Sequence, residues 1–304
     1  MDTNNNLEIK DGVLVSYHGN EKHVVIPDGV KTIGKSAFFH LLIPPIHGRM
    51  SDIKRDDLTS VIIPESVKSI EDYAFFGRNG LTSMTIPPNV TKIGKYAFHE
   101  CSNLTSATIP ENIESIGEGA FQGCSALTSV TIPQGITKIE KDTFSSCYSL
   151  ASVTIPPSVT KIEMNAFAFC ENLTSITIPE SVEIIESSAF KRCKNLVSVT
   201  IPPRVTKIGM NAFAFCENLT SITIPKSVEI IESGAFEYCQ NLVSVSIPPS
   251  VKNIEAHAFS NCPNLTAVTI PEGTKVDETA FKLLDNNTYT REERITILRP
   301  FLND

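Results

Sequence analysis

Apolar and polar residues alternate along the chain in a pattern that repeats every 23 residues. An earlier, divergent repeat starts at Glu21. The regular repeats begin at Leu58, Leu81, Leu104, Leu127, Leu150, Leu173, Leu196, Leu219, Leu242 and Leu265. A period of about 20 to 50 residues is typical of solenoids and repeat arrays. The 304 residues are therefore predicted to form one solenoid rather than the two globular domains that the length alone suggests.

Residues 127–149 show how one repeat is predicted to fold, with positions counted from its leucine. Apolar and hydroxyl residues alternate over 127–132, which is the period of a short strand with one buried face. Pro133 ends the strand because it has no N–H to donate. Ile136 and Ile139 follow as buried anchors on an extended or turning segment. Positions 17, 18 and 21 are spaced for one side of a short helical turn.

The inward side chains of one repeat cannot form a core without neighbouring repeats. Positions 1, 4, 6, 10, 13, 17, 18 and 21 carry them. Stacking buries this set, and strands of successive repeats then pair in parallel about 4.8 Å apart. The predicted fold class is an α/β repeat solenoid. It is expected to form an arc, with the parallel β-sheet on the concave face and the short helical turns on the convex face.

Cysteine, proline and phenylalanine fall into columns of this repeat. Eleven of the 19 prolines occupy position 7, and ten of the 16 phenylalanines occupy position 18. All eight cysteines occupy position 21: Cys101, Cys124, Cys147, Cys170, Cys193, Cys216, Cys239 and Cys262. Metal sites need cysteines or histidines that converge on one ion, and stacked parallel Cβ vectors suit a disulfide badly. We therefore expect a reduced, buried thiol column and no bound metal.

The consensus L-x-x-V-x-I-P-x-x-V-x-x-I-x-x-x-A-F-x-x-C-x-N resembles the BspA-like leucine-rich repeats of bacterial and some protozoan proteins. The match covers residues 21–282. The family includes many cell-surface and secreted proteins that take part in adhesion and host contact. The resemblance therefore implies a non-catalytic protein-binding module with no cofactor.

Three regions are predicted around this repeat. Residues 1–20 form an N-terminal cap, in which Asp11-Gly12 favours the turn of a hairpin. The solenoid spans 21–282, with a loop insertion near 39–57. Residues 283–304 form a helical cap, since Thr290 and Glu293 make a capping box ahead of a short helix over 291–298.

The net charge and the absence of known motifs exclude several classes of function. The charge of 26 − 34 = −8 argues against a nucleic-acid partner. The sequence contains no run of 18 apolar residues, so no transmembrane helix is predicted. The first residues lack the basic and apolar regions of a signal peptide, so the sequence leaves the compartment open between surface, secreted and cytoplasmic. No catalytic motif is present.

Glu140, Glu163 and Glu186 occupy the same position in three successive repeats and form a column of carboxylates. The column is interpreted either as solvated or as a cation site.

Hydroxyl residues form two columns on the outward side of the strands. Positions 3 and 5 hold Ser152 and Thr154, Ser175 and Thr177, and Ser198 and Thr200 in three successive repeats. One interpretation is β-propensity with hydroxyls bonded to their ladder neighbours. The other is a shallow surface for an extended peptide or a glycan.

Position 20 carries four conspicuous side chains in successive repeats: Phe169, Arg192, Phe215 and Tyr238. Because position 20 precedes the buried cysteine, these side chains are predicted to lie outside, where Arg192 can stack between aromatic rings. Aromatic and arginine side chains are also enriched at protein interfaces. The alternative is that the rings fold back and only stabilise the repeat, and the sequence does not separate the two.

A recent duplication supports binding over catalysis. Residues 150–195 and 196–241 are identical at 38 of 46 positions, which lengthens a surface without building a new pocket. The predicted function is a non-catalytic protein-binding module of the adhesion or host-interaction type. An intracellular interaction scaffold is the alternative, and an enzyme is the third hypothesis. The partner is a protein or a glycan, and the oligomeric state does not follow from the sequence.

Overall fold

The computed structural model describes residues 6–39 and 58–283, together with the backbone of 296–298. These residues contain strands and turns but no helix. The chain divides into two compact units. Unit 1 comprises Met1–Ile136 and Asp142–Leu150, and unit 2 comprises Thr137–Lys141 and Ala151–Asp304.

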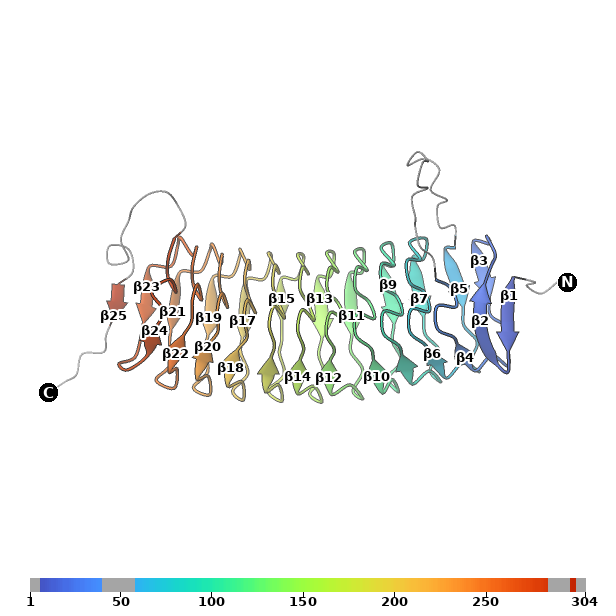
Figure 1. Cartoon of the computed structure of the whole chain (residues 1–304), viewed down its shortest axis with the longest axis horizontal. Coiled ribbons are helices and arrows are strands. Elements are labelled where there is room, and N and C mark those ends of the chain that lie inside the picture. The colour runs from blue at the N-terminus through green and yellow to red at the C-terminus, as the bar shows by residue number, and fades with distance from the viewer. Residues whose placement is uncertain (1–5, 40–57, 284–295, 299–304) are drawn as a thin grey trace, which may run out of the picture. The chain divides into compact units, whose positions relative to one another are not determined.

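Unit 1 begins with an antiparallel hairpin and continues with two short strands in each repeat (Figure 1). Its strands are β1 (Leu7–Lys10), β2 (Val13–Tyr17), β3 (His23–Val25), β4 (Thr32–Ile33), β5 (Ser60–Ile62), β6 (Ser69–Ile70), β7 (Ser83–Thr85), β8 (Lys92–Ile93), β9 (Ser106–Thr108), β10 (Ser115–Ile116) and β11 (Ser129–Thr131). β2, β4, β6, β8 and β10 pair in parallel in that order. The hairpin of β1 and β2 turns at Asp11 and Gly12, both with positive φ, and adds an antiparallel edge to this sheet.

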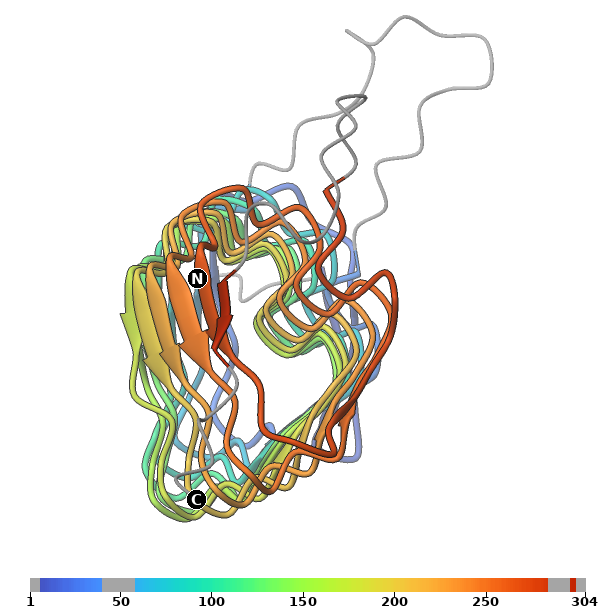
Figure 2. The same cartoon turned by 90° about the vertical axis from the view of Figure 1, so that its left-hand side faces the viewer.

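Unit 2 holds two parallel columns of strands, which Figure 1 shows one above the other and Figure 2 shows nearly end-on. Its strands are β12 (Lys138–Ile139), β13 (Ser152–Thr154), β14 (Lys161–Ile162), β15 (Ser175–Ile176), β16 (Ile184–Ile185), β17 (Ser198–Thr200), β18 (Lys207–Ile208), β19 (Ser221–Thr223), β20 (Ile230–Ile231), β21 (Ser244–Ser246), β22 (Asn253–Ile254), β23 (Ala267–Thr269), β24 (Lys275–Val276) and β25 (Thr296–Leu298). One sheet runs β15-β17-β19-β21-β23-β25 and the other β12-β14-β16-β18-β20-β22-β24. Equivalent residues of successive repeats face each other, as Ser198 and Ser221 do.

Stacked phenylalanines at position 18 form the centre of each unit. In unit 2 the rings from Phe167 to Phe259, and then Phe281 at position 17 of the last repeat, follow one another at centroid distances of 5.1–5.5 Å with nearly parallel planes. In unit 1 the stack runs from Phe144 back to Phe38 and ends on Tyr17 of the hairpin, 5.1 Å from Phe38. Each repeat thus contributes one buried ring, and the identical register of the repeats aligns the rings.

The α/β fold class is wrong, because the segment predicted as a helical turn is not a helix in any described repeat. Positions 16 and 20 adopt left-handed backbone conformations, for example at Asn165 (φ 57°) and Phe169 (φ 63°). A left-handed residue every four positions interrupts the right-handed helix that the i+3 and i+4 spacing favours. The architecture is a β-solenoid of parallel strands joined by turns.

Hydrogen bonds between repeats explain why the turns replace a helix. The amides of Asn165, Phe167 and Phe169 donate to carbonyls of the next repeat at 3.1, 2.9 and 2.7 Å. In a helix these groups would bond within their own repeat. Stacking of the repeats therefore provides hydrogen-bond partners for the backbone N–H groups of the turns, as it does for those of the strands.

The chain ends depart from the predicted regions. Residues 40–57, which hold the predicted insertion, lie outside the described residues, as do 284–295 and 299–304. Most of the predicted helix over 291–298 therefore has no description. Its last residues, Thr296–Leu298, form β25, which pairs in parallel with β23. The prediction of helix is wrong for these three residues, which extend the sheet.

Candidate binding surface

The four side chains at position 20 form a ladder on the turns of unit 2. The guanidinium of Arg192 lies 5.5 Å from the ring centroid of Phe169 and 5.4 Å from that of Phe215. Phe215 and Tyr238 stack at 4.5 Å with their planes 10° apart. Arg192 is exposed and the three rings are half-buried. The structure thus brings together the four residues singled out from the sequence, in a continuous cation–π and aromatic stack.

The backbone at position 20 is unfavourable for such large side chains. Phe169, Arg192, Phe215 and Tyr238 have φ values of 63°, 61°, 60° and 58°. A residue with a Cβ pays roughly 1–2 kcal/mol for this conformation, which glycine adopts freely. Gly77 and Gly123 occupy the same position in unit 1. The fold therefore does not require large residues here.

The predicted hydroxyl columns lie on the strands of unit 2, away from the ladder. The six residues are Ser152, Thr154, Ser175, Thr177, Ser198 and Thr200, and all are exposed. Ser175 pairs with Ser198 across β15 and β17. None of the six hydroxyls bonds another described residue. Several threonines at position 2 do form such bonds, as when Thr220 donates to the Val197 carbonyl at 3.3 Å. The columns at positions 3 and 5 therefore face solvent.

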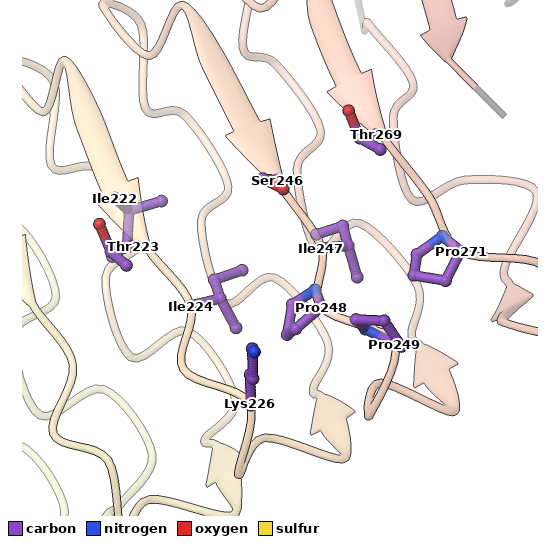
Figure 3. A pocket seen from close by; sticks show the side chains of 10 residues that line it. All are labelled: Ile222, Thr223, Ile224, Lys226, Ser246, Ile247, Pro248, Pro249, Thr269 and Pro271. Carbon is purple, nitrogen blue, oxygen red and sulfur yellow. The ribbon is translucent and has the colours of Figure 1, made fainter. Parts of the chain in front are cut away.

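A depression of about 450 Å³ opens where β19, β21 and β23 end (Figure 3). Ile224 and Pro248 are buried beneath it, and the exposed Lys226 and Pro249 stand at its rim. Proline ends each strand at position 7, so the depression has apolar walls and few backbone donors. The sequence gives no signal of this depression, because its residues come from three consecutive repeats and most of them are common residues of the consensus.

A second aromatic cluster lies on the turns of unit 1 and was also missed. Phe39 stacks on Phe76 at 5.1 Å, and Phe76 lies 4.8 Å from the ring of His99. Tyr73 and Tyr96 stack beside them at 5.3 Å. Burial lowers the pKa of His99, which keeps it neutral at pH 7. Aromatic residues at positions 16 and 19 of successive repeats are the sequence signal that could have revealed this cluster.

The carboxylates of the glutamate column form ion pairs with neighbouring lysines. Lys138 lies 3.0 Å from Glu140 and 3.5 Å from Glu163, and Lys161 lies 3.1 Å from Glu163 and 3.0 Å from Glu186. Alternating charges in one line neutralise each other. Across residues 6–39 and 58–283, no group of three or more His, Cys, Asp or Glu side chains could hold a metal ion.

The cysteine column is buried, and its thiols donate to phenylalanine carbonyls of the preceding repeat. Cys193 donates to the carbonyl of Phe167 at 3.3 Å, and Cys216 does the same to Phe190 at 3.3 Å. All eight cysteines are free. Burial raises the pKa of the Cys216 and Cys262 thiols to about 12. Neutral buried thiols pack as small apolar side chains and are poor nucleophiles.

The native chain is accordingly expected to resist thiol reagents. With Ellman's reagent at pH 8, we expect almost no release of thionitrobenzoate over minutes, because all eight thiols are buried. In guanidinium chloride all eight cysteines should react. Rapid reaction of the native chain at one or more thiols would contradict the buried column.

The repeat pattern matches a known family over most of its length. The BspA type leucine rich repeat region matches residues 53–174 and 160–288 in six copies. The chain belongs to the BspA-type leucine-rich repeat family. The resemblance drawn from the consensus is thus confirmed. No curated protein matches this BspA-type chain in sequence. Within the described residues, no helix of this leucine-rich repeat protein is long and apolar enough to cross a membrane.

Solved structures of bacterial leucine-rich repeat proteins resemble this BspA-type chain. A leucine rich cell surface protein of Faecalibacterium prausnitzii is 29% identical over 89% of this chain and 89% of its own, with a TM-score of 0.50. A leucine-rich repeat protein of Bacteroides ovatus is 25% identical over 87% and 84%, with a TM-score of 0.55. The pneumococcal vaccine antigen PcpA, 19% identical over 98% and 91% with a TM-score of 0.57, shares the fold.

Proposed function

We propose that the chain is a non-catalytic protein-binding module of the adhesion or host-interaction type, and that the ladder of Phe169, Arg192, Phe215 and Tyr238 holds its partner. One observation carries the proposal. Large aromatic and arginine side chains occupy a left-handed position that glycine or asparagine would fill at lower cost. Backbone strain of this kind is concentrated at functional sites.

The chemistry of the ladder suits a protein partner. Aromatic rings and arginine dominate the binding energy of protein interfaces, and the rings offer a large contact area at a small loss of conformational freedom. Arg192 is held between two rings and is therefore ordered before a partner arrives. The fold family supports protein binding in general, and the similar protein of F. prausnitzii is a cell surface protein.

Binding to extracellular matrix proteins tests the proposal. The full chain and the variant F215N/Y238N are compared by biolayer interferometry on purified fibronectin, laminin and collagen. Asn261 already occupies position 20 with φ 55°, so the variant keeps a side chain that the backbone accepts. We expect at least one matrix protein to bind the chain, and the variant to bind roughly tenfold more weakly or worse.

A strand-face variant serves as the matched control. T177A/T200A removes two exposed hydroxyls, one directly after β15 and one at the end of β17, and leaves the ladder intact. It should bind as the unaltered chain does. Loss of binding in this variant but not in F215N/Y238N would move the site to the hydroxyl columns. Absence of binding to every matrix protein would contradict the adhesion role.

The eight free cysteines favour an alternative, an intracellular interaction scaffold. Unpaired thiols are the rule in reducing compartments, whereas proteins of oxidising compartments commonly form disulfides. Antibody labelling of intact and permeabilised cells of the source organism separates the two. The adhesion role requires labelling of intact cells, and the scaffold requires labelling only after permeabilisation.

A further inference from the structure

The depression at the ends of β19, β21 and β23 combines an apolar floor with polar side chains around it. Its floor is apolar, because Ile222, Ile224 and Ile247 are buried beneath it. The buried Pro248 and the exposed Pro249 also line it. In Figure 3 their rings lie between Ile224 and Pro271.

Hydroxyl groups at the strand ends are available to a ligand. Thr223, Ser246 and Thr269 line the depression in three successive repeats. Thr223 and Ser246 are exposed and Thr269 is half-buried. None of the three hydroxyls forms a hydrogen bond with another residue in the described part of the chain. The backbone carbonyl of Pro248, by contrast, already accepts from Val251 at 3.0 Å. Polar recognition would therefore come from side chains.

Lys226 supplies the only charge among the lining residues. Its ammonium group is exposed, and no described residue forms an ion pair or hydrogen bond with it. The same repeat position carries proline in both adjacent repeats, at Pro203 and Pro249. The nearest acidic residues at this position are Glu180 and Glu272, each two repeats or about 10 Å away. The cation is thus unneutralised beside an apolar surface, in a chain whose net charge is −8.

We propose that this depression binds an extended segment of a partner protein in which an aspartate or glutamate lies beside an apolar side chain. The carboxylate pairs with Lys226, and the apolar side chain lies on Ile224, Pro248 and Pro249. The hydroxyls of Thr223 and Ser246 bond the polar backbone of the segment. A volume of about 450 Å³ suits one or two side chains of such a segment. This site is separate from the ladder, and does not require the ladder to function.

The duplication gives the site an internal counterpart of opposite charge. Forty-six residues earlier, eight of the ten lining positions hold the same residue. The two differences are Glu180 in place of Lys226 and Thr200 in place of Ser246. The substitution Lys226→Glu therefore copies a residue that the repeat already accepts, and Glu180→Lys copies the proposed site into the earlier repeats.

A random dodecapeptide library displayed on phage and selected on the full chain tests the proposal. We expect enrichment of peptides with Asp or Glu next to an apolar residue. A synthetic enriched peptide, followed by fluorescence anisotropy, should bind K226E roughly tenfold more weakly or worse. The same peptide with its acids changed to amides should lose affinity for the unaltered chain.

Two further variants make the result specific. E180K should bind a second copy of the peptide, and F215N/Y238N should bind as the unaltered chain does, so that failure of the ladder and failure of this site are distinguishable. Equal affinity for K226E and the unaltered chain would overturn the proposal. So would a selection that enriches no acidic peptide.

Discussion

Raising the pH from 9 to 10.5 is expected to unfold the solenoid, because its buried thiols cannot ionise while it is folded. Burial raises the pKa of six thiols: Cys124, Cys147, Cys193, Cys216, Cys239 and Cys262. For Cys216 and Cys262 it rises from 9.0 to about 12. In the unfolded chain the same thiols lose their protons near pH 9.

The sign and size of the effect follow from proton linkage. A group whose pKa is higher in the folded state contributes its full stability below the unfolded pKa, and loses it as the pH rises toward the folded pKa. Above pH 9 the unfolded state binds fewer protons, so each thiol lowers the free energy of unfolding by about 1.4 kcal/mol per pH unit. Six thiols together give roughly 8 kcal/mol per pH unit, which is comparable with the whole stability of a typical domain.

Urea unfolding at pH 8.5, 9.5 and 10.5 in the presence of a reductant measures the slope. The variant C147S/C216S retains two donors to the phenylalanine carbonyls but removes two titrating groups. Its slope should be smaller by roughly 3 kcal/mol per pH unit. This comparison also removes the contributions of tyrosines and lysines, which titrate in the same range. Equal slopes for the two proteins would show that the thiols are not protected by burial.

Replacing Arg78 by alanine is expected to destabilise unit 1 by about 2–4 kcal/mol. Arg78 occupies position 21, where later repeats carry cysteine, and it is 7% exposed. Its Nε donates to the Phe38 carbonyl at 2.6 Å, as the thiol of Cys101 donates to Phe75 at 3.2 Å. Its guanidinium also lies 5.5 Å from the ring of Tyr17 in the hairpin. Alanine would leave a buried carbonyl without its donor and open a gap beside Tyr17.

Arg78→Cys is the matched control for this prediction. Cysteine restores the donor that position 21 supplies elsewhere, so this variant should lose less stability than Arg78→Ala. Thermal unfolding followed by circular dichroism measures both. If Arg78→Ala melts within a degree of the unaltered chain, or if both variants lose the same stability, the arginine does not take the place of the thiol.

The period of the sequence determines the core because burial in a solenoid is a property of repeat position. The phenylalanine and cysteine columns and the strand at positions 3–5 follow from it directly, as Phe213, Cys216 and Ser198–Thr200 show. Helix and turn are not separated by that spacing. Positions 17, 18 and 21 cluster on one side in both, and only the left-handed φ of residues such as Asn165 distinguishes them. Positions 16 and 20 adopt that left-handed conformation, and the serine, tyrosine and phenylalanine residues found there give no sequence signal of it.

The candidate surfaces differ in how far the sequence reveals them. The ladder was predictable because one position holds aromatic and arginine residues in four successive repeats. The depression around Lys226 was not, because the residues that line it are mostly the common prolines and isoleucines of the consensus. The cluster of Phe39, Phe76 and His99 also follows from one repeat position, since position 19 holds a ring in three successive repeats.

The role of the ladder is tested most directly by measuring stability and binding on the same variant. Phe213, two residues from Phe215, is fully buried, and F213A should lower the free energy of unfolding by about 3–5 kcal/mol. For F215N/Y238N we expect a loss under about 2 kcal/mol, because relief of the left-handed backbone offsets part of the lost stacking. The same variant should lose binding to the matrix protein that the unaltered chain recognises. A loss of stability as large as that of F213A, with binding retained, would contradict a binding role for the ladder.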